Sequence, residues 1–272
     1  MSPVTSRDMD RSVNIICMKW GKLYGPDYVN FLRAGVARHL KRPFRFVCFT
    51  DDAAGLDSEV EALPLPELGL VQGKSDQRWR KLAVFRKDLF DLHGTTLFLD
   101  LDLVIVDSID AFFEAPGRFL IIRDDDLFRR KPLRKLNPQR DRFLHSVGNS
   151  SVFRYDIGQH VDILDAYLAD PAAATAAYEI SQQFQSAQLA KAGLLDYWPK
   201  GWCVSFKNDC VPRHLNSYRA DPAVPAGAKI VVFAGTPKMG DVLAGGGHRW
   251  HRRIGNVDWL RSAWSGQAAE RD

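Results

Sequence analysis

Apolar runs and polar, glycine-containing turns alternate through the first part of the chain. Residues 13–18 and 44–50 are short runs of β-branched, aliphatic and aromatic side chains, which predict two strands. Between them, residues 28–40 carry apolar side chains at helical spacing, so we expect a helix with Asp27 as its N-cap. A strand, a helix and a strand in this order form a βαβ unit, which favours a parallel sheet.

The pattern is less regular in the rest of the chain. A short third strand is expected at 60–65, and residues 79–92 predict a basic amphipathic helix that ends at Gly94. Continuous aliphatic runs at 97–99 and 103–106 predict a buried strand. The remaining expected elements are a short helix at 109–113, a strand at 119–122, a charged loop at 124–142, a turn entering a strand at 148–153, helices at 158–169 and 179–192 with an alanine-rich helix or linker at 172–177 between them, and a strand at 229–233.

Two aspartates, Asp100 and Asp102, interrupt the aliphatic run that predicts the buried strand. Because side chains alternate along a strand, we expect both carboxylates on the same side. Two ionised carboxylates there repel each other and lose hydration, so a cation or several donors must compensate them. Their hard oxygen atoms suit Mg²⁺ or Mn²⁺, which then bridge to substrate phosphates. The alternative for a bare Asp-x-Asp is a strand end at which two solvated aspartates cap the next turn.

Ligands of open α/β sheets bind at the carboxyl ends of the strands. The glycine-punctuated loop at 18–25 follows the first predicted strand, and residues 51–55 follow the second. The aspartate pair at 100–102 follows a third. We therefore expect these three segments to converge on one site.

Composition places the chain among ordinary globular proteins. It has 272 residues, of which 46% are hydrophobic and 26% charged, enough for one large α/β domain or two closely packed halves. The modest net charge of +4, with local basic clusters, favours an anionic ligand or membrane headgroups over nucleic acid. The four cysteines are too widely spaced for a zinc knuckle, so we expect reduced thiols.

Several of these segments resemble nucleotide-sugar glycosyltransferases of the GT-A fold, in particular the glycogenin and bacterial lipopolysaccharide galactosyltransferase type. Leu97–Asp102 resembles the family's Asp-x-Asp strand, and Asn149–Ser151 resembles the Asn-Ser-Gly turn that follows it. Val231–Lys238 resembles the carboxy-terminal His-x-x-Gly-x-x-Lys segment. The basic helix before the aspartates matches the family's position for cations that face the nucleotide sugar. The likeness covers roughly residues 13–260.

The resemblance implies a fold and an activity. The fold is a single GT-A-like domain over 1–272, a three-layer α/β/α sandwich with a mostly parallel central sheet. Residues of about 13–107 would form the nucleotide-binding half, and residues of about 108–265 the acceptor half. The activity is transfer of a hexose, with retention of configuration, from a nucleoside diphosphate sugar to a glycan or glycolipid hydroxyl in surface-polysaccharide synthesis. A UDP-sugar is the favoured donor.

The resemblance also implies residue roles. Asp100 and Asp102 would hold the Mn²⁺ or Mg²⁺ cofactor, and Lys238 would help to neutralise the leaving diphosphate, whose charge rises as the glycosidic bond breaks. Residues 201–207 resemble the strand that lines the acceptor side. The other residues expected at the nucleotide sugar are Trp20, Tyr24, Asp51, Arg78, Lys81, Asn149, Ser150 and Gly235.

The chain departs from the family pattern at two positions. Val232 stands where the family has a metal-binding histidine, six residues before the lysine. Gln182-Gln183 stands where the family commonly has Asp-Gln. A substitute metal ligand could come from His248 or His251 in the glycine-rich loop near the carboxy terminus.

Two other functions compete with this interpretation. The run Asp100–Val104 also fits the motif of haloacid-dehalogenase-like phosphatases, with Asp100 as nucleophile and Asp102 as general acid. That motif usually opens its fold, whereas here a βαβ unit and a further helix precede it. The missing histidine and aspartate leave a non-catalytic nucleotide-sugar-binding protein as the third hypothesis.

Location is predicted from what the chain lacks and from its basic clusters. No apolar stretch approaches a transmembrane helix, and the amino terminus has no signal-peptide core, so a cytoplasmic protein is expected. The basic clusters Arg129–Lys131 and Arg249–Arg253 suggest peripheral contact with the inner membrane face.

Overall fold

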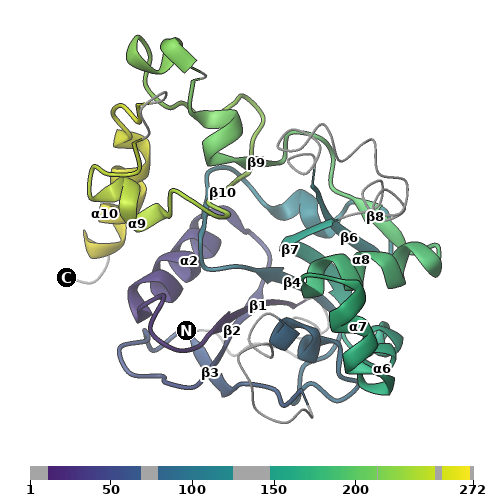
Figure 1. The fold of residues 1–272 in the computed structure, drawn as a ribbon. Helices are drawn as coiled ribbons and strands as arrows, with labels where there is room; N and C mark the ends of the chain where they lie inside the picture. The colour runs from purple at the N-terminus through teal and green to yellow at the C-terminus, as the bar shows by residue number, and fades with distance from the viewer. Residues whose placement is uncertain (1–11, 69–78, 125–147, 213, 249–252, 270–272) are drawn as a thin grey trace, which may run out of the picture.

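A seven-stranded sheet runs through the centre of the computed structural model, which describes residues 12–68, 79–124, 148–212, 214–248 and 253–269 (Figure 1). The strand order is β3-β2-β1-β4-β7-β6-β8. The strands are β1 (Val13–Lys19), β2 (Phe44–Thr50), β3 (Glu61–Pro64), β4 (Thr95–Leu99), β6 (Phe119–Arg123), β7 (Gly148–Asp156) and β8 (Leu195–Tyr197).

Most neighbours in this sheet are parallel. β3, β2, β1 and β4 form one parallel block, and β6 pairs in parallel with β8. β7 lies antiparallel between β4 and β6, with a register shift between Ile121 and Ile122. The predicted mostly parallel central sheet is confirmed.

A smaller sheet lies beside the first and has the order β5-β10-β9. Its strands are β5 (Leu103–Ile105), β9 (Cys203–Ser205) and β10 (Ile230–Val232). β10 pairs antiparallel with β5 and parallel with β9. Segments from the middle and the end of the chain therefore meet directly beside the aspartate motif.

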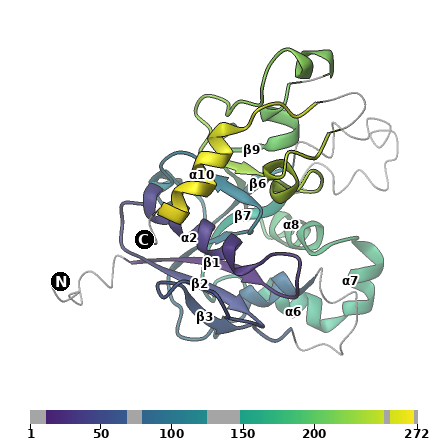
Figure 2. The ribbon, with the colours of Figure 1, turned by 90° about the vertical axis from the view of Figure 1, so that its left-hand side faces the viewer.

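Helices cover both faces of the large sheet (Figures 1 and 2). One face packs on α2 (Pro26–His39) and the other on α6 (Val161–Ala169) and α8 (Ser181–Lys191), with α7 (Pro171–Ala177) beside them. α10 (Asp258–Ala269) lies against α2, and α9 (Met239–Leu243) begins at the site described below. The short helical turns are η1 (Arg80–Phe85), η2 (Asp110–Phe113), η4 (Phe206–Cys210) and η5 (His214–Tyr218).

The alternation of side chains along β1 explains why this strand is buried on both faces. Ile15 and Cys17 enter the hydrophobic core under α2, whereas Ile16 and Met18 enter the core under η1, α6 and α8. A third core joins the smaller sheet to α9 and α10. Within the described residues, no helix has the length and apolar composition that crossing a bilayer requires.

The prediction of a long basic helix at 79–92 is wrong. Only η1 forms, and the backbone becomes extended at Arg86. The four consecutive residues Leu82–Phe85 are all buried, so this segment has no exposed polar face of the kind an amphipathic helix needs. The apolar residues of this segment are buried as expected, but they form a short helical turn that packs against the large sheet.

The prediction of one continuous strand through the aspartates is also wrong. β4 ends at Leu99, the chain bends over residues 100–102, and β5 starts in the other sheet at Leu103. The Asp100 backbone N–H donates to the Ser151 carbonyl at 2.9 Å, whereas the Phe233 N–H donates to the Asp102 carbonyl at 2.8 Å. The alternation argument for the two carboxylates therefore does not apply, because both lie in the bend between strands of different sheets.

Smaller differences have local causes. α2 begins at Pro26 with Gly25 as its N-cap, because proline suits the first helical position, and Asp27 lies inside the first turn. The turn expected at 148–153 is part of β7, and the strand expected at 201–207 ends at Ser205 in a π-helical turn. Most of the predicted charged loop at 124–142 lies outside the described residues.

Candidate active site

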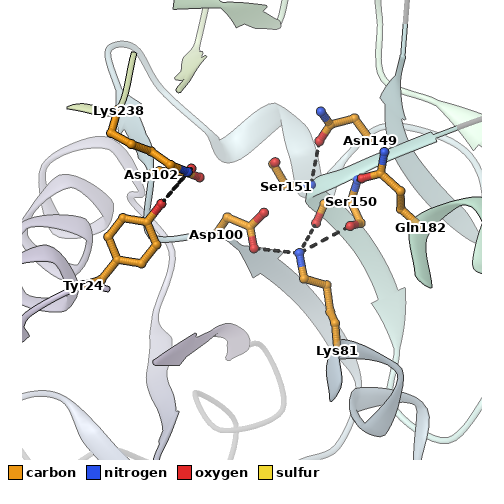
Figure 3. Close-up of polar contacts among 9 residues, drawn as sticks. All are labelled: Tyr24, Lys81, Asp100, Asp102, Asn149, Ser150, Ser151, Gln182 and Lys238. Carbon is orange, nitrogen blue, oxygen red and sulfur yellow. Dashed lines mark hydrogen bonds and ion pairs between the residues drawn. The ribbon is translucent and has the colours of Figure 1, made fainter. Parts of the chain in front are cut away.

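The site lies where the carboxyl ends of β1 and β4 meet the start of α8 and the N-cap of α9. A cavity of about 750 Å³ opens there. It is lined mainly by polar and aromatic side chains, namely Trp20, Lys22, Tyr24, Lys81, Asp100, Asp102, Ser150, Ser181, Gln182 and Lys238. Figure 3 shows Asp100 and Asp102 with a separate lysine on each.

Asp100 is held by Lys81, which η1 presents from below in Figure 3. The Lys81 Nζ donates to Asp100 Oδ1 at 2.7 Å, and to the carbonyl and hydroxyl oxygens of Ser150 at 3.1 and 3.3 Å. It also lies 4.8 Å from the centre of the Phe98 ring. Burial raises the pKa of the Asp100 carboxyl, and the charge of Lys81 opposes that rise.

Asp102 is held by a second group of residues. The Lys238 Nζ lies 3.1 Å from Asp102 Oδ2 and donates to the Tyr24 hydroxyl at 2.9 Å. The Tyr24 hydroxyl in turn donates to the same carboxylate oxygen at 3.0 Å. Burial, followed by the negative charge of Asp102, raises the pKa of Tyr24 well above its usual value, so its hydroxyl keeps its proton as a donor.

Asp51 supports the cavity wall from outside the cavity. Its carboxylate accepts a hydrogen bond from the Gly21 backbone N–H at 2.9 Å, and Gly21 has a φ of 63° that favours glycine. The loop that follows β1 is thereby tied to the end of β2. This loop carries Trp20 and Tyr24, so the predicted convergence of the loop at 18–25 with the aspartates is confirmed. Residues 51–55 are not among those that line the cavity, so the third predicted segment only supports it from behind.

Besides Asp51, two more predicted residues lie away from this cavity. Asn149 lines a second cavity of about 400 Å³, although its neighbour Ser150 lines the first. Gly235 has a φ of 82°, and a Cβ placed there would lie 3.0 Å from the Lys207 Nζ, so it leaves room for a lysine. Arg78 lies outside the described residues.

Gln182 is a cavity residue that the sequence indicated only as a replacement for the aspartate common in the family. It lines the cavity, and its Oε1 accepts from the Ser150 backbone N–H at 3.4 Å. Gln183 instead accepts from the Glu179 N–H. The sequence signal that could have indicated it is a polar residue near the start of the helix predicted at 179–192, which packs against β7.

The protein offers a divalent cation two carboxylates. Among the described residues there is no group of three or more His, Cys, Asp and Glu side chains that could hold a metal. Val232 is a buried member of β10, and both ring nitrogens of His248 contact the backbone of Gly245 and Ile254. Two carboxylates fit Mg²⁺ or Mn²⁺ when substrate phosphates and water complete the coordination.

Comparison with solved structures identifies the architecture. No protein-family model and no curated protein matches the sequence. The structure matches a solved galactosyltransferase, LgtC, in complex with donor and acceptor sugar analogues, with a TM-score of 0.62. The match covers 93% of this chain and 95% of that chain, at 12% sequence identity. The chain has a GT-A-like fold.

This match confirms the fold class predicted from the sequence. It also places the Asp-x-Asp segment after the fourth strand of a GT-A-like sheet, where a haloacid-dehalogenase-like phosphatase would have it in its opening strand. The phosphatase hypothesis therefore loses its structural basis.

Proposed function

We propose that this protein is a glycosyltransferase that moves a hexose from a nucleoside diphosphate sugar, favourably a UDP-sugar, to a hydroxyl of a glycan or glycolipid. The observation that carries the proposal is the cavity of about 750 Å³ at the strand ends of a GT-A-like sheet, which is lined by two carboxylates and three lysines, two of them paired with the carboxylates. Cavities of this size are typical of small-molecule sites. The positive side chains suit a diphosphate, and the aromatic ones suit a base or sugar face.

The proposed reaction breaks the bond between the anomeric carbon and the diphosphate oxygen, and it forms a bond from that carbon to the acceptor oxygen. Negative charge grows on the diphosphate as it leaves, and Lys81 and Lys238, together with the exposed Lys22, are cavity cations able to neutralise it. The acceptor proton goes to the departing diphosphate, so transfer with retention needs no separate protein base. Mn²⁺ or Mg²⁺ held by Asp100 and Asp102 would supply further positive charge.

The second cavity is the proposed acceptor site. It is lined by hydrogen-bonding groups suited to sugar hydroxyls, including those of Asn149, Ser205 and Asp209. Because Asn149 and Ser150 are adjacent in β7, the two cavities come within one residue of each other. On this basis residues 13–107 would supply most of the nucleotide site, and residues 108–265 would bind the acceptor and add Ser150, Gln182 and Lys238 to the nucleotide site. A lipid-linked acceptor in surface-polysaccharide synthesis would bring the protein to the cytoplasmic membrane face.

The test is sugar transfer from a panel of UDP-, GDP- and TDP-sugars, with Mn²⁺ or Mg²⁺ and a glycan or membrane extract as acceptor. Labelled product and released nucleotide are both measured. We expect the Asp102→Asn variant to lose at least about 100-fold in rate, because it weakens stabilisation of the leaving group. The matched control is Asp107→Asn, since Asp107 also pairs with a lysine but has a side chain that is 58% exposed.

The outcomes separate the competing functions. Nucleotide binding without transfer from any donor would support the non-catalytic hypothesis against this proposal. Phosphate release from small phosphate esters, with no sugar transfer, would revive the phosphatase hypothesis. Equal activity of Asp102→Asn and Asp107→Asn would remove the aspartate motif from the reaction.

A further inference from the structure

Each carboxylate of the aspartate motif has its own lysine in this structure. Lys81 is bound to Asp100 at 2.7 Å, and Lys238 is bound to Asp102 at 3.1 Å. Both lysines line the same cavity as the carboxylates, although they come from segments far apart in the sequence. The Lys81 side chain is only 14% exposed, so its ammonium group has lost much of its hydration and depends on these contacts.

The formal charges of these four side chains cancel. Two carboxylates and two ammonium groups leave no net negative charge to attract a divalent cation, and the exposed Lys22, which also lines the cavity, adds a positive charge. A cation that enters alone therefore adds two uncompensated positive charges to the site, and a diphosphate that enters alone adds uncompensated negative charge. Entry of both returns the site close to neutrality, so electrostatics favours their binding together.

The occupied carboxylate oxygens strengthen this coupling. Asp102 Oδ2 already accepts hydrogen bonds from both Lys238 and Tyr24. A Mg²⁺ ion binds oxygen at about 2.1 Å, so it cannot share that oxygen with a nearby ammonium group without strong repulsion. A cation that takes this oxygen therefore requires Lys238 to find another acceptor, and a diphosphate in the cavity offers one.

We propose that Lys81 and Lys238 are exchangeable counter-ions: they hold Asp100 and Asp102 in the free protein and transfer to the phosphates when the nucleotide binds. Cation binding is thereby made dependent on the diphosphate. This inference rests on the proposed function, because it takes a nucleoside diphosphate as the ligand of the cavity. It assigns the two lysines a role in the free protein as well as during the reaction.

The first experiment measures Mn²⁺ binding by electron paramagnetic resonance, with and without saturating UDP. Binding of Mn²⁺ to UDP alone is subtracted from a titration that lacks protein. We expect UDP to raise the affinity for Mn²⁺ by roughly 5- to 150-fold, the usual range of coupling between two sites. Calorimetry should give the same factor for the effect of Mn²⁺ on UDP affinity, because coupling is reciprocal.

Lysine variants distinguish the contribution of the two lysines to Mn²⁺ affinity from the general effect of phosphate oxygens as added metal ligands. Lys81→Met and Lys238→Met each remove one ammonium group and keep much of the apolar stem, so both should bind Mn²⁺ alone more tightly than the unmodified protein. The factor by which UDP raises their affinity for Mn²⁺ should be smaller than in the unmodified protein. Lys238→Arg keeps the charge and should behave like the unmodified protein. The matched control is Lys229→Met, because Lys229 forms a Lys–Asp pair with Asp107 outside the cavity.

Unchanged Mn²⁺ affinity in both methionine variants would overturn the inference, as would equal Mn²⁺ affinity with and without UDP. UDP binding that is tight and indifferent to Mn²⁺ would also overturn it, while leaving the proposed glycosyltransferase activity intact. Failure to bind any nucleotide, with or without cation, would overturn both.

Discussion

Arg154 provides the sharpest test of how the fold is held together behind the site. It lies on β7, is only 7% exposed, and has a guanidinium group that donates to three backbone carbonyls. Nη1 donates to Phe112 at 2.7 Å and to Ala115 at 2.8 Å, and Nη2 donates to Gly117 at 2.6 Å. These contacts fix the segment between η2 and β6 to the central sheet.

The expected cost of Arg154→Met follows from these contacts. A hydrogen bond from a charged group contributes about 1.5–3 kcal/mol, so the three together set an upper range of roughly 4.5–9 kcal/mol. Two of the carbonyls are only partly buried and can regain water. Burial of the guanidinium is itself unfavourable, as the lowered pKa of Arg154 shows, and the substitution removes this desolvation cost. We therefore expect a loss of about 2–4 kcal/mol in the free energy of unfolding.

The matched control is Arg45→Met on β2. Arg45 also donates three hydrogen bonds, to Glu61 at 3.2 and 2.7 Å and to Asp91 at 3.1 Å. Its partners are exposed carboxylates, so we expect a cost below about 1 kcal/mol. Urea unfolding followed by tryptophan fluorescence measures both variants. The reasoning is refuted if Arg45→Met costs as much as Arg154→Met, or if Arg154→Met costs less than about 1 kcal/mol.

Three further predictions concern packing and protonation. Gly148→Ala should destabilise by about 1–3 kcal/mol in urea unfolding, because the new Cβ would lie 2.5 Å from the buried Ile121 side chain; an unchanged midpoint would contradict this. Burial lowers the pKa of His160, so the free energy of unfolding should decrease as pH falls below about 6.5. A His160→Gln variant should lose less of this free energy than the unmodified protein between pH 7 and 5. Parallel curves of stability against pH for the two proteins would contradict the prediction. Burial raises the pKa of Cys210 to about 12, so native protein should react slowly with a disulfide reagent at pH 8, whereas unfolded protein should expose all four free thiols; a fast reaction of the native protein would contradict this burial.

The sequence predicted the parts of the fold that depend on local periodicity. β1, α2 and β2 follow directly from apolar spacing, because strand and helix periods differ and this segment shows each in turn. The ends of these strands then placed the loop after β1 beside the aspartates. A parallel sheet with a site at its carboxyl edge was therefore accessible from residue patterns alone.

The parts that the sequence did not predict depend on contacts between distant segments. Nothing local in the aliphatic run around Leu101 indicates that the chain changes sheets there, because β5 is defined by its pairing with β10 more than a hundred residues later. The basic residues before the motif suggested cations facing a ligand. The structure adds that Lys81 is already bound to Asp100, a partner that periodicity cannot identify.

The bend between the two sheets has a direct consequence for the site. Asp100 is fixed through Ser151 and Lys81 to the large sheet and η1, whereas Asp102 is fixed through Phe233 and Lys238 to the smaller sheet and α9. The distance between the carboxylates is therefore set by how the two sheets pack, with the buried Leu101 between them. A shift of the smaller sheet would move Asp102 and Lys238 together and leave Asp100 and Lys81 in place. The two Lys–Asp pairs are thus carried by separate parts of the fold although their charges act in one cavity, which is why the Lys81→Met and Lys238→Met variants test the counter-ion proposal from two sides.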